Sequence, residues 1–89
     1  MVTVIVQHEV KDFTAWKKVF DADEPNRSRA GVKTAGLYTS VKNPNDVTVI
    51  LEAPSAESVT AMMSRPEMEE TMKSAGVISA PVASILNKV

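Results

Sequence analysis

The sequence contains one histidine, His8, at the end of the β-rich run VTVIVQHEV. Histidine is the side chain whose unperturbed pKa lies nearest neutrality, so His8 could act as a general acid or base in a cavity. Strand alternation places it on the same face as Val4 and Val6. Burial among valines would lower the pKa of His8 and leave a neutral base at pH 7. The alternative is a strand-end histidine that is hydrogen-bonded or half exposed.

Three of the four aromatic side chains follow directly, at helical spacing. Phe13, Trp16 and Phe20 are separated by three and four residues, so a helix presents them as one stripe. They could form one wall of a cavity for a planar ligand, although aromatic residues at this spacing also form ordinary core. Methionines farther along the chain could line the opposite wall with adaptable side chains, or simply fill gaps in the core: Met62, Met63, Met68 and Met72.

Polar side chains elsewhere give weaker signals. Tyr38 could donate a proton or hydrogen bond to a substrate oxygen, but strand alternation places it opposite Leu37 and away from His8. Arg27, with Arg29, could bind an anionic group at a pocket mouth, or could be an ordinary surface arginine. The acidic run DADE, residues 21–24, surrounds a helix break, so its carboxylates diverge and favour a solvated helix end over a metal site.

Composition limits the possible functions. A chain of 89 residues predicts one domain, residues 1–89. It has no cysteine and one histidine, which excludes disulfides, thiolate metal sites and multi-histidine sites within one chain. With 10 basic and 11 acidic residues it lacks the basic field expected for binding nucleic acid or an anionic membrane. No apolar run approaches the roughly 20 residues of a membrane span, and the first ten residues lack a basic leader, so we expect a cytoplasmic protein.

The N-terminal half predicts a strand, a helix and a hairpin. Residues 2–10 alternate as a strand, and Asp12 can cap the helix that follows. Pro25 should interrupt that helix, helical turns can resume over 26–30, and Gly31 suits the left-handed residue that ends them. The segment VKTAGLYTSVKNPNDVTVILEA, residues 32–53, predicts a β-hairpin. The hairpin register that we expect pairs Val41 with Val47 and places Leu37 near Leu51.

The C-terminal half predicts two helical segments and a strand. Ser55 can cap a helix over residues 56–63, and Pro66 can begin another that ends at Gly76. Residues 80–88, which begin with an alanine and Pro81, predict a last strand. The resulting β-α-β-β-α-β order indicates an α+β, ferredoxin-like fold, with a four-stranded antiparallel sheet and helices on one face.

The predicted sheet is apolar on both faces, although helices can cover only one. Ile5, Ile50 and Ile85 add apolar character opposite some of their valine and leucine neighbours. An uncovered apolar sheet face needs a second cover, and a second copy of the same sheet would supply one. We therefore expect a homodimer that associates sheet to sheet.

The segments DFTAWKKVFD, RSRAGV, DVTVILEA and SAESV together resemble the dimeric α+β-barrel superfamily. This superfamily includes antibiotic-biosynthesis monooxygenase-like, muconolactone-isomerase-like and polyketide-cyclase-like small bacterial proteins. The resemblance implies a homodimer whose sheets form a barrel, and a cavity between sheet and helices for small, often aromatic, molecules. It also implies chemistry that needs no bound metal or flavin.

Two hypotheses remain open from the sequence. The first is a small cofactor-independent enzyme, such as a cyclase, isomerase or monooxygenase-like protein, that acts on a hydrophobic or aromatic molecule. In this hypothesis His8 moves protons while Trp16 and Phe20 shape the cavity. The second is a non-catalytic homodimer that binds a small hydrophobic molecule or serves as an interaction module.

Overall fold

The computed structural model describes residues 1–79 and 82–89, without the side chains of residues 66–69. The described elements follow the predicted order, and each predicted helical region consists of two short helices. In chain order they are β1 (Val2–Glu9), α1 (Phe13–Ala22), α2 (Glu24–Arg29), β2 (Lys33–Thr39), β3 (Asp46–Ala53), α3 (Ala56–Met63), α4 (Pro66–Ser74) and β4 (Val82–Asn87). The start of the predicted last strand, at 80–81, lies outside the described residues.

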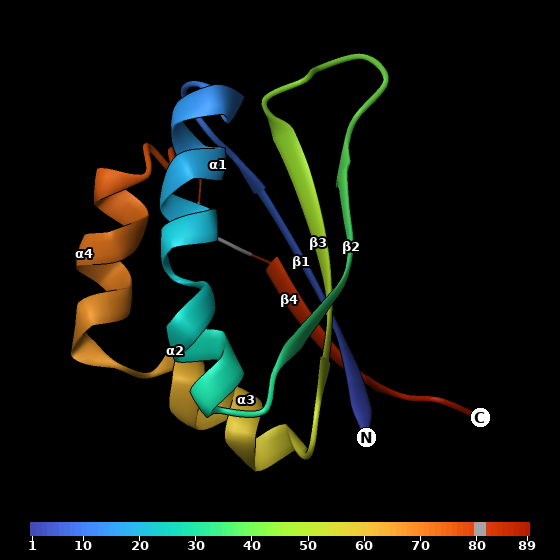
Figure 1. Ribbon diagram of the computed structural model, residues 1–89. Coiled ribbons are helices and arrows are strands. Elements are labelled where there is room, and N and C mark those ends of the chain that lie inside the picture. Colours follow the sequence, from blue (N-terminus) through green and yellow to red (C-terminus); the bar gives the residue numbers. More distant parts are fainter. Residues whose placement is uncertain (80–81) are drawn as a thin grey trace.

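The strands form one antiparallel sheet in the order β2-β3-β1-β4. All four helices lie on the same side of this sheet (Figure 1). This confirms the predicted ferredoxin-like α+β fold. None of the described helices is long and apolar enough to span a membrane.

The core lies between the helices and the sheet. Every second side chain of the central strands β1 and β3 points toward the helices, and these two strands supply half of the buried hydrophobic residues. The buried hydrophobic residues are Val4, Val6, Val10, Trp16, Val32, Val47, Val49, Leu51, Ala53, Val59, Met62 and Ala75.

Local signals in the sequence determine where the helices begin and end. The side chains of Asp12 and Ser55 each accept a hydrogen bond from a backbone amide in the first turn of α1 and α3, as predicted. The first helix breaks at Asp23, and Pro25 then occupies the first turn of α2, where its missing N–H costs no hydrogen bond. Gly31, with φ 76°, follows α2 in the left-handed conformation expected there.

The predicted hairpin is present, but its predicted register was wrong by two residues. Thr39 pairs with Val47 and Leu37 with Val49, so Val41 lies in the loop and is fully exposed. The loop is longer than predicted because it has its own hydrogen bonds, one of which the Asp46 amide donates to the Asn43 carbonyl oxygen. A two-residue shift preserves the side-chain faces, so Tyr38 still lies opposite Leu37.

The helices leave one sheet face uncovered. Ile5 and Ile50 lie there as predicted, as a directly opposed pair that is partly buried. Ile85, in contrast, pairs with Val4 and therefore lies on the helix side, so its predicted contribution to the uncovered face was wrong. Leu86, which pairs with Thr3, extends the uncovered face instead and is 44% exposed. We call this surface, made by Ile5, Tyr38, Ile50, Val82 and Leu86, the open face.

Candidate functional site

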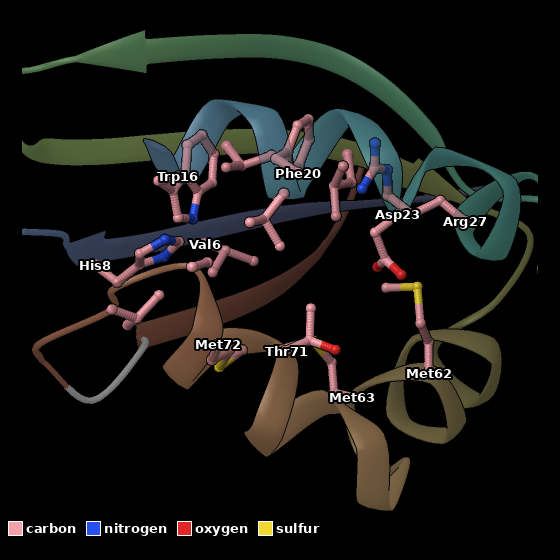
Figure 2. Close-up of a pocket in the computed structure, with 15 residues that line it drawn as sticks. Val6, His8, Trp16, Phe20, Asp23, Arg27, Met62, Met63, Thr71 and Met72 are labelled. Atoms are coloured by element: carbon pink, nitrogen blue, oxygen red, sulfur yellow. The ribbon is translucent and has the colours of Figure 1, made fainter. Parts of the chain in front are cut away.

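A cavity of about 100 Å³ lies between the helices and the helix-facing side of the sheet. Its lining is mostly apolar, with a few polar side chains at separate positions (Figure 2). Strands β1 and β3 form one wall, and residues of the four helices, together with Asp23, Ala75 and Val77, form the rest. The lining residues are Val6, His8, Trp16, Val19, Phe20, Asp23, Arg27, Val49, Leu51, Met62, Met63, Thr71, Met72, Ala75 and Val77.

His8 faces this cavity from β1, as strand alternation predicted. Its side chain is only 8% exposed, and neither ring nitrogen has a hydrogen-bond partner among the described residues. Burial lowers the pKa of His8 because it disfavours the charged imidazolium, and the nearby Asp46 carboxylate partly opposes this effect. The imidazole therefore stays neutral at pH 7, with one nitrogen able to accept a proton.

An aromatic row from α1 continues from His8 along the cavity. The ring centroids of His8 and Trp16 lie 5.5 Å apart, and those of Trp16 and Phe20 lie 4.9 Å apart in a stacked arrangement. Trp16 points its indole nitrogen toward the cavity beside His8 (Figure 2). The helical spacing of these residues thus places both rings on the cavity wall, as the sequence predicted.

Arg27 lines the end of the cavity that is remote from His8 (Figure 2). Its side chain is only 6% exposed, and its guanidinium carbon lies 3.8 Å from the centroid of the Phe20 ring. Desolvation lowers the pKa of Arg27, while the charges of nearby acidic residues, Asp23 first, raise it. The alternative of a solvated surface arginine is therefore wrong, although the guanidinium remains charged near neutrality.

Two of the predicted ligand-binding residues lie outside the cavity. Phe13 is partly buried and packs against Trp16 with its ring centroid 5.9 Å away, but it does not line the space. Tyr38 is 58% exposed on the open face and covers Gly36, where an added Cβ would lie 2.7 Å from Tyr38 Cε2. Within one chain, Tyr38 therefore cannot reach a ligand beside His8.

Met62 and Met63 line the wall opposite the aromatic row, together with Met72. These three methionines take the position that the sequence suggested for them. The Met68 side chain lies outside the described residues.

Sequence analysis missed two polar residues of the lining, Asp23 and Thr71. The sequence predicts that Asp23 and its acidic neighbours form a solvated helix end. Its carboxylate instead accepts a hydrogen bond from Asn26 Nδ2 at 2.6 Å and lies 3.6 Å from Arg65 Nη2. The signal that could have identified Asp23 is the helix break before Pro25, which turns this residue inward. Thr71 carries no comparable signal beyond its place beside Met72.

The cavity residues offer proton transfer and aromatic contacts. Among the residues that the structure describes, no three His, Cys, Asp or Glu side chains gather as metal ligands. The polar groups of the lining are the neutral imidazole of His8, the buried cation of Arg27, the Asp23 carboxylate and the Thr71 hydroxyl, in an otherwise apolar space.

Comparisons with solved structures show the same fold in monooxygenase-type proteins. An antibiotic biosynthesis monooxygenase matches with TM-score 0.73 and 14% identity over 100% of this chain and 99% of its own. A Bordetella bronchiseptica protein assigned to the same class matches with TM-score 0.79 and 16% identity, over 99% and 96% of the two chains. A variant of SnoaB, a cofactor-independent oxygenase from Streptomyces nogalater, matches with TM-score 0.73 and 13% identity, over 98% and 91%.

These likenesses confirm the predicted ferredoxin-like α+β fold. At such low identity, shared architecture does not transfer an activity. No protein-family model matches the sequence, and no curated protein matches it either.

Proposed function

We propose that this protein is a small cofactor-independent enzyme of the monooxygenase-like type, acting on a hydrophobic or aromatic molecule in the cavity. The observation that carries the proposal is His8, a buried imidazole without a hydrogen-bond partner among the described residues, facing an apolar space. Leaving a buried polar group unpaired costs roughly 1–3 kcal/mol, so a ligand that pairs with it gains affinity. A cofactor-independent oxygenase has the same fold, so this architecture can house such an activity.

In this proposal His8 is the general base. Its lowered pKa keeps the imidazole neutral, so it can take a proton from an acidic C–H or O–H of the bound molecule. The surrounding apolar walls exclude water and strengthen the interaction between the resulting imidazolium and the substrate anion. Cyclisation and isomerisation need no more than such proton transfers.

Oxygenation without a bound cofactor requires more of the substrate, because it must itself reduce dioxygen. A methylene carbon would become a ketone by losing two hydrogens and gaining one oxygen atom, while the second oxygen atom leaves as water. All four electrons accepted by dioxygen then come from the substrate. His8 would remove the first proton and return it to the departing oxygen.

The size of the cavity limits the substrate. An engineered cavity of about 150 Å³ holds one benzene ring, whereas this cavity measures about 100 Å³. A substrate of one ring therefore requires its walls to move. Met62, Met63 and Met72 can supply this movement because methionine side chains are unbranched and flexible.

The decisive experiment compares wild type with His8→Leu on a panel of one-ring phenols and cyclic enols. Oxygen uptake and absorbance would report turnover, and Lys18→Ala, an exposed change on α1, is the control. We expect turnover in wild type and Lys18→Ala and its loss in His8→Leu. Ligand binding without turnover in all three proteins would instead support the non-catalytic binding module.

We also propose that a second copy of the chain covers the open face. Tyr38, Val82 and Leu86 are exposed there beside the partly buried Ile5 and Ile50. These apolar side chains share the face with Thr3, Gln7, Thr48 and Ser84. Exposed apolar side chains gathered on one side of a sheet are typical of an interface. Because the cavity lies on the helix side, dimerisation through the open face would leave the lining of each cavity within one chain.

A further inference from the structure

Among the described residues, no carboxylate forms an ion pair with the buried guanidinium of Arg27. Burying a charge is costly unless an opposite charge pairs with it. Among the described residues, however, the two ion pairs in this region join Lys17 to Asp21 and Arg65 to Asp23. Arg27 contacts instead the face of Phe20, which provides a weak electrostatic attraction. The positive charge of Arg27 is thus left available to a bound molecule.

His8 and Arg27 lie toward opposite ends of the same cavity (Figure 2). Trp16 and Phe20 connect them through three successive contacts, His8 to Trp16, Trp16 to Phe20 and Phe20 to Arg27. The space therefore has a proton acceptor at one end, a cation at the other, and apolar walls between.

We propose that the ligand of this cavity is an organic carboxylate with an apolar body, and that its carboxylate binds the Arg27 guanidinium. Its acidic C–H or O–H then lies at His8, a part of the inference that rests on the proposed function. The planar guanidinium presents paired donors that match the two oxygens of a carboxylate. The apolar body fills the space between Trp16, Phe20 and the methionines.

The charge of Asp23 argues for a carboxylate over a phosphate. Its side chain also lines the cavity, and a phosphate dianion would meet stronger repulsion there than a singly charged carboxylate. Asn26 and Arg65 hold the Asp23 carboxylate, so it does not neutralise Arg27 by direct pairing. A neutral molecule, in turn, would leave the buried cation unpaired.

A surface groove gives such an anion a route of entry. Asn26, Ala30, Ser58, Ala61 and Arg65 line this groove together with Met62, which also lines the cavity. Arg65, which forms an ion pair with Asp23, lies on this route, and the flexible Met62 side chain lines both the groove and the cavity. An anion that enters here reaches Arg27 before it reaches His8.

Binding of benzoate and of its neutral isostere benzamide tests the inference directly. Trp16 is the only tryptophan of the chain and lines the cavity, so its fluorescence reports occupancy. The proteins to compare are wild type, Arg27→Met and Arg29→Met, the last being a matched control because Arg29 is exposed on the same helix. We expect wild type and Arg29→Met to bind benzoate at least about tenfold more tightly than benzamide, and Arg27→Met to lose this preference.

Equal affinity of wild type for both probes, or a benzoate preference that survives Arg27→Met, would overturn the inference. Should Arg27→Met not fold, Arg27→Lys keeps the charge but loses the planar donors, and we expect it to retain only part of the preference. Because the probes report binding alone, benzoate preference without turnover of any substrate would refute the proposed enzyme and leave the carboxylate site intact. Turnover of neutral substrates with no preference for benzoate would refute the carboxylate site and leave the proposed enzyme intact.

Discussion

The imidazole of His8 lies 5.5 Å from the indole of Trp16, centroid to centroid, with the two rings tilted by 58°. Because the His8 nitrogens have no partner among the described residues, packing fixes the ring without using its donor or acceptor. A base positioned in this way can meet a ligand without first breaking a hydrogen bond within the protein.

His8→Leu should therefore stabilise the protein. Leucine fills a similar volume without unpaired polar atoms, and we expect a gain of about 1–2 kcal/mol in the free energy of unfolding. Urea denaturation at pH 7.5 would measure it. A loss of stability would mean that the imidazole makes favourable polar contacts in solution, and that it is not held free for a ligand.

Stability should also depend on pH through His8. The folded protein holds the pKa of His8 below its ordinary value of 6.5, so the unfolded chain binds this proton more readily. The free energy of unfolding should then have its full value above about pH 6.5. It should fall as the pH drops from there toward the pKa of His8 in the folded protein. Urea midpoints between pH 8 and pH 5 would show this fall in wild type, and the His8→Leu curve should lack that part of it.

The negative charge of Asp46 should raise the pKa of His8. This carboxylate raises the pKa of His8 against the dominant effect of burial. Asp46→Asn should lower the pKa of His8 further, and Glu52→Gln, at the far end of the same strand, should leave it unchanged. Titration of the His8 ring protons by NMR would compare the two variants. An equal downward shift in both would indicate a diffuse effect of net charge and not a local one.

Much of the fold could be predicted because local signals agree with one another. The caps at Asp12 and Ser55, the break before Pro25 and the glycine after α2 each fix the end of a helix by backbone chemistry alone. The hairpin register could not be predicted, because hydrogen bonds within the loop decided its length. Hydrogen bonds within a loop leave no periodic pattern in the sequence.

The candidate site was predictable where side-chain direction follows from periodicity. Strand alternation placed His8, and helical spacing placed Trp16 and Phe20, on the cavity wall. The burial of Arg27 could not be predicted, because it depends on the angle at which α2 leaves α1. Phe13 shares the aromatic stripe with Trp16, yet it lies outside the cavity because the stripe is longer than the space it lines.

A charge on the open face should separate the proposed dimer. Leu86→Lys places an ammonium within the apolar patch, where association would have to desolvate it. Val41→Lys is the matched control, since Val41 is exposed in the hairpin loop and away from that face. In sedimentation velocity at micromolar concentration we expect dimers for wild type and Val41→Lys, and monomers for Leu86→Lys. A monomeric wild type would refute the proposed dimer outright.

Shortening Met62 should open the cavity to the surface groove, because this side chain lines both. Met62→Ala should accelerate benzoate binding and admit naphthoate, whose second ring needs still more room than benzoate, at a cost of about 2–5 kcal/mol in the free energy of unfolding. Met63→Ala is the matched control: Met63 lines the cavity but not the groove, so the change should enlarge the cavity without opening it. Stopped-flow Trp16 fluorescence would measure both association rates. Equal acceleration in the two variants would place the route of entry elsewhere than beside Arg65.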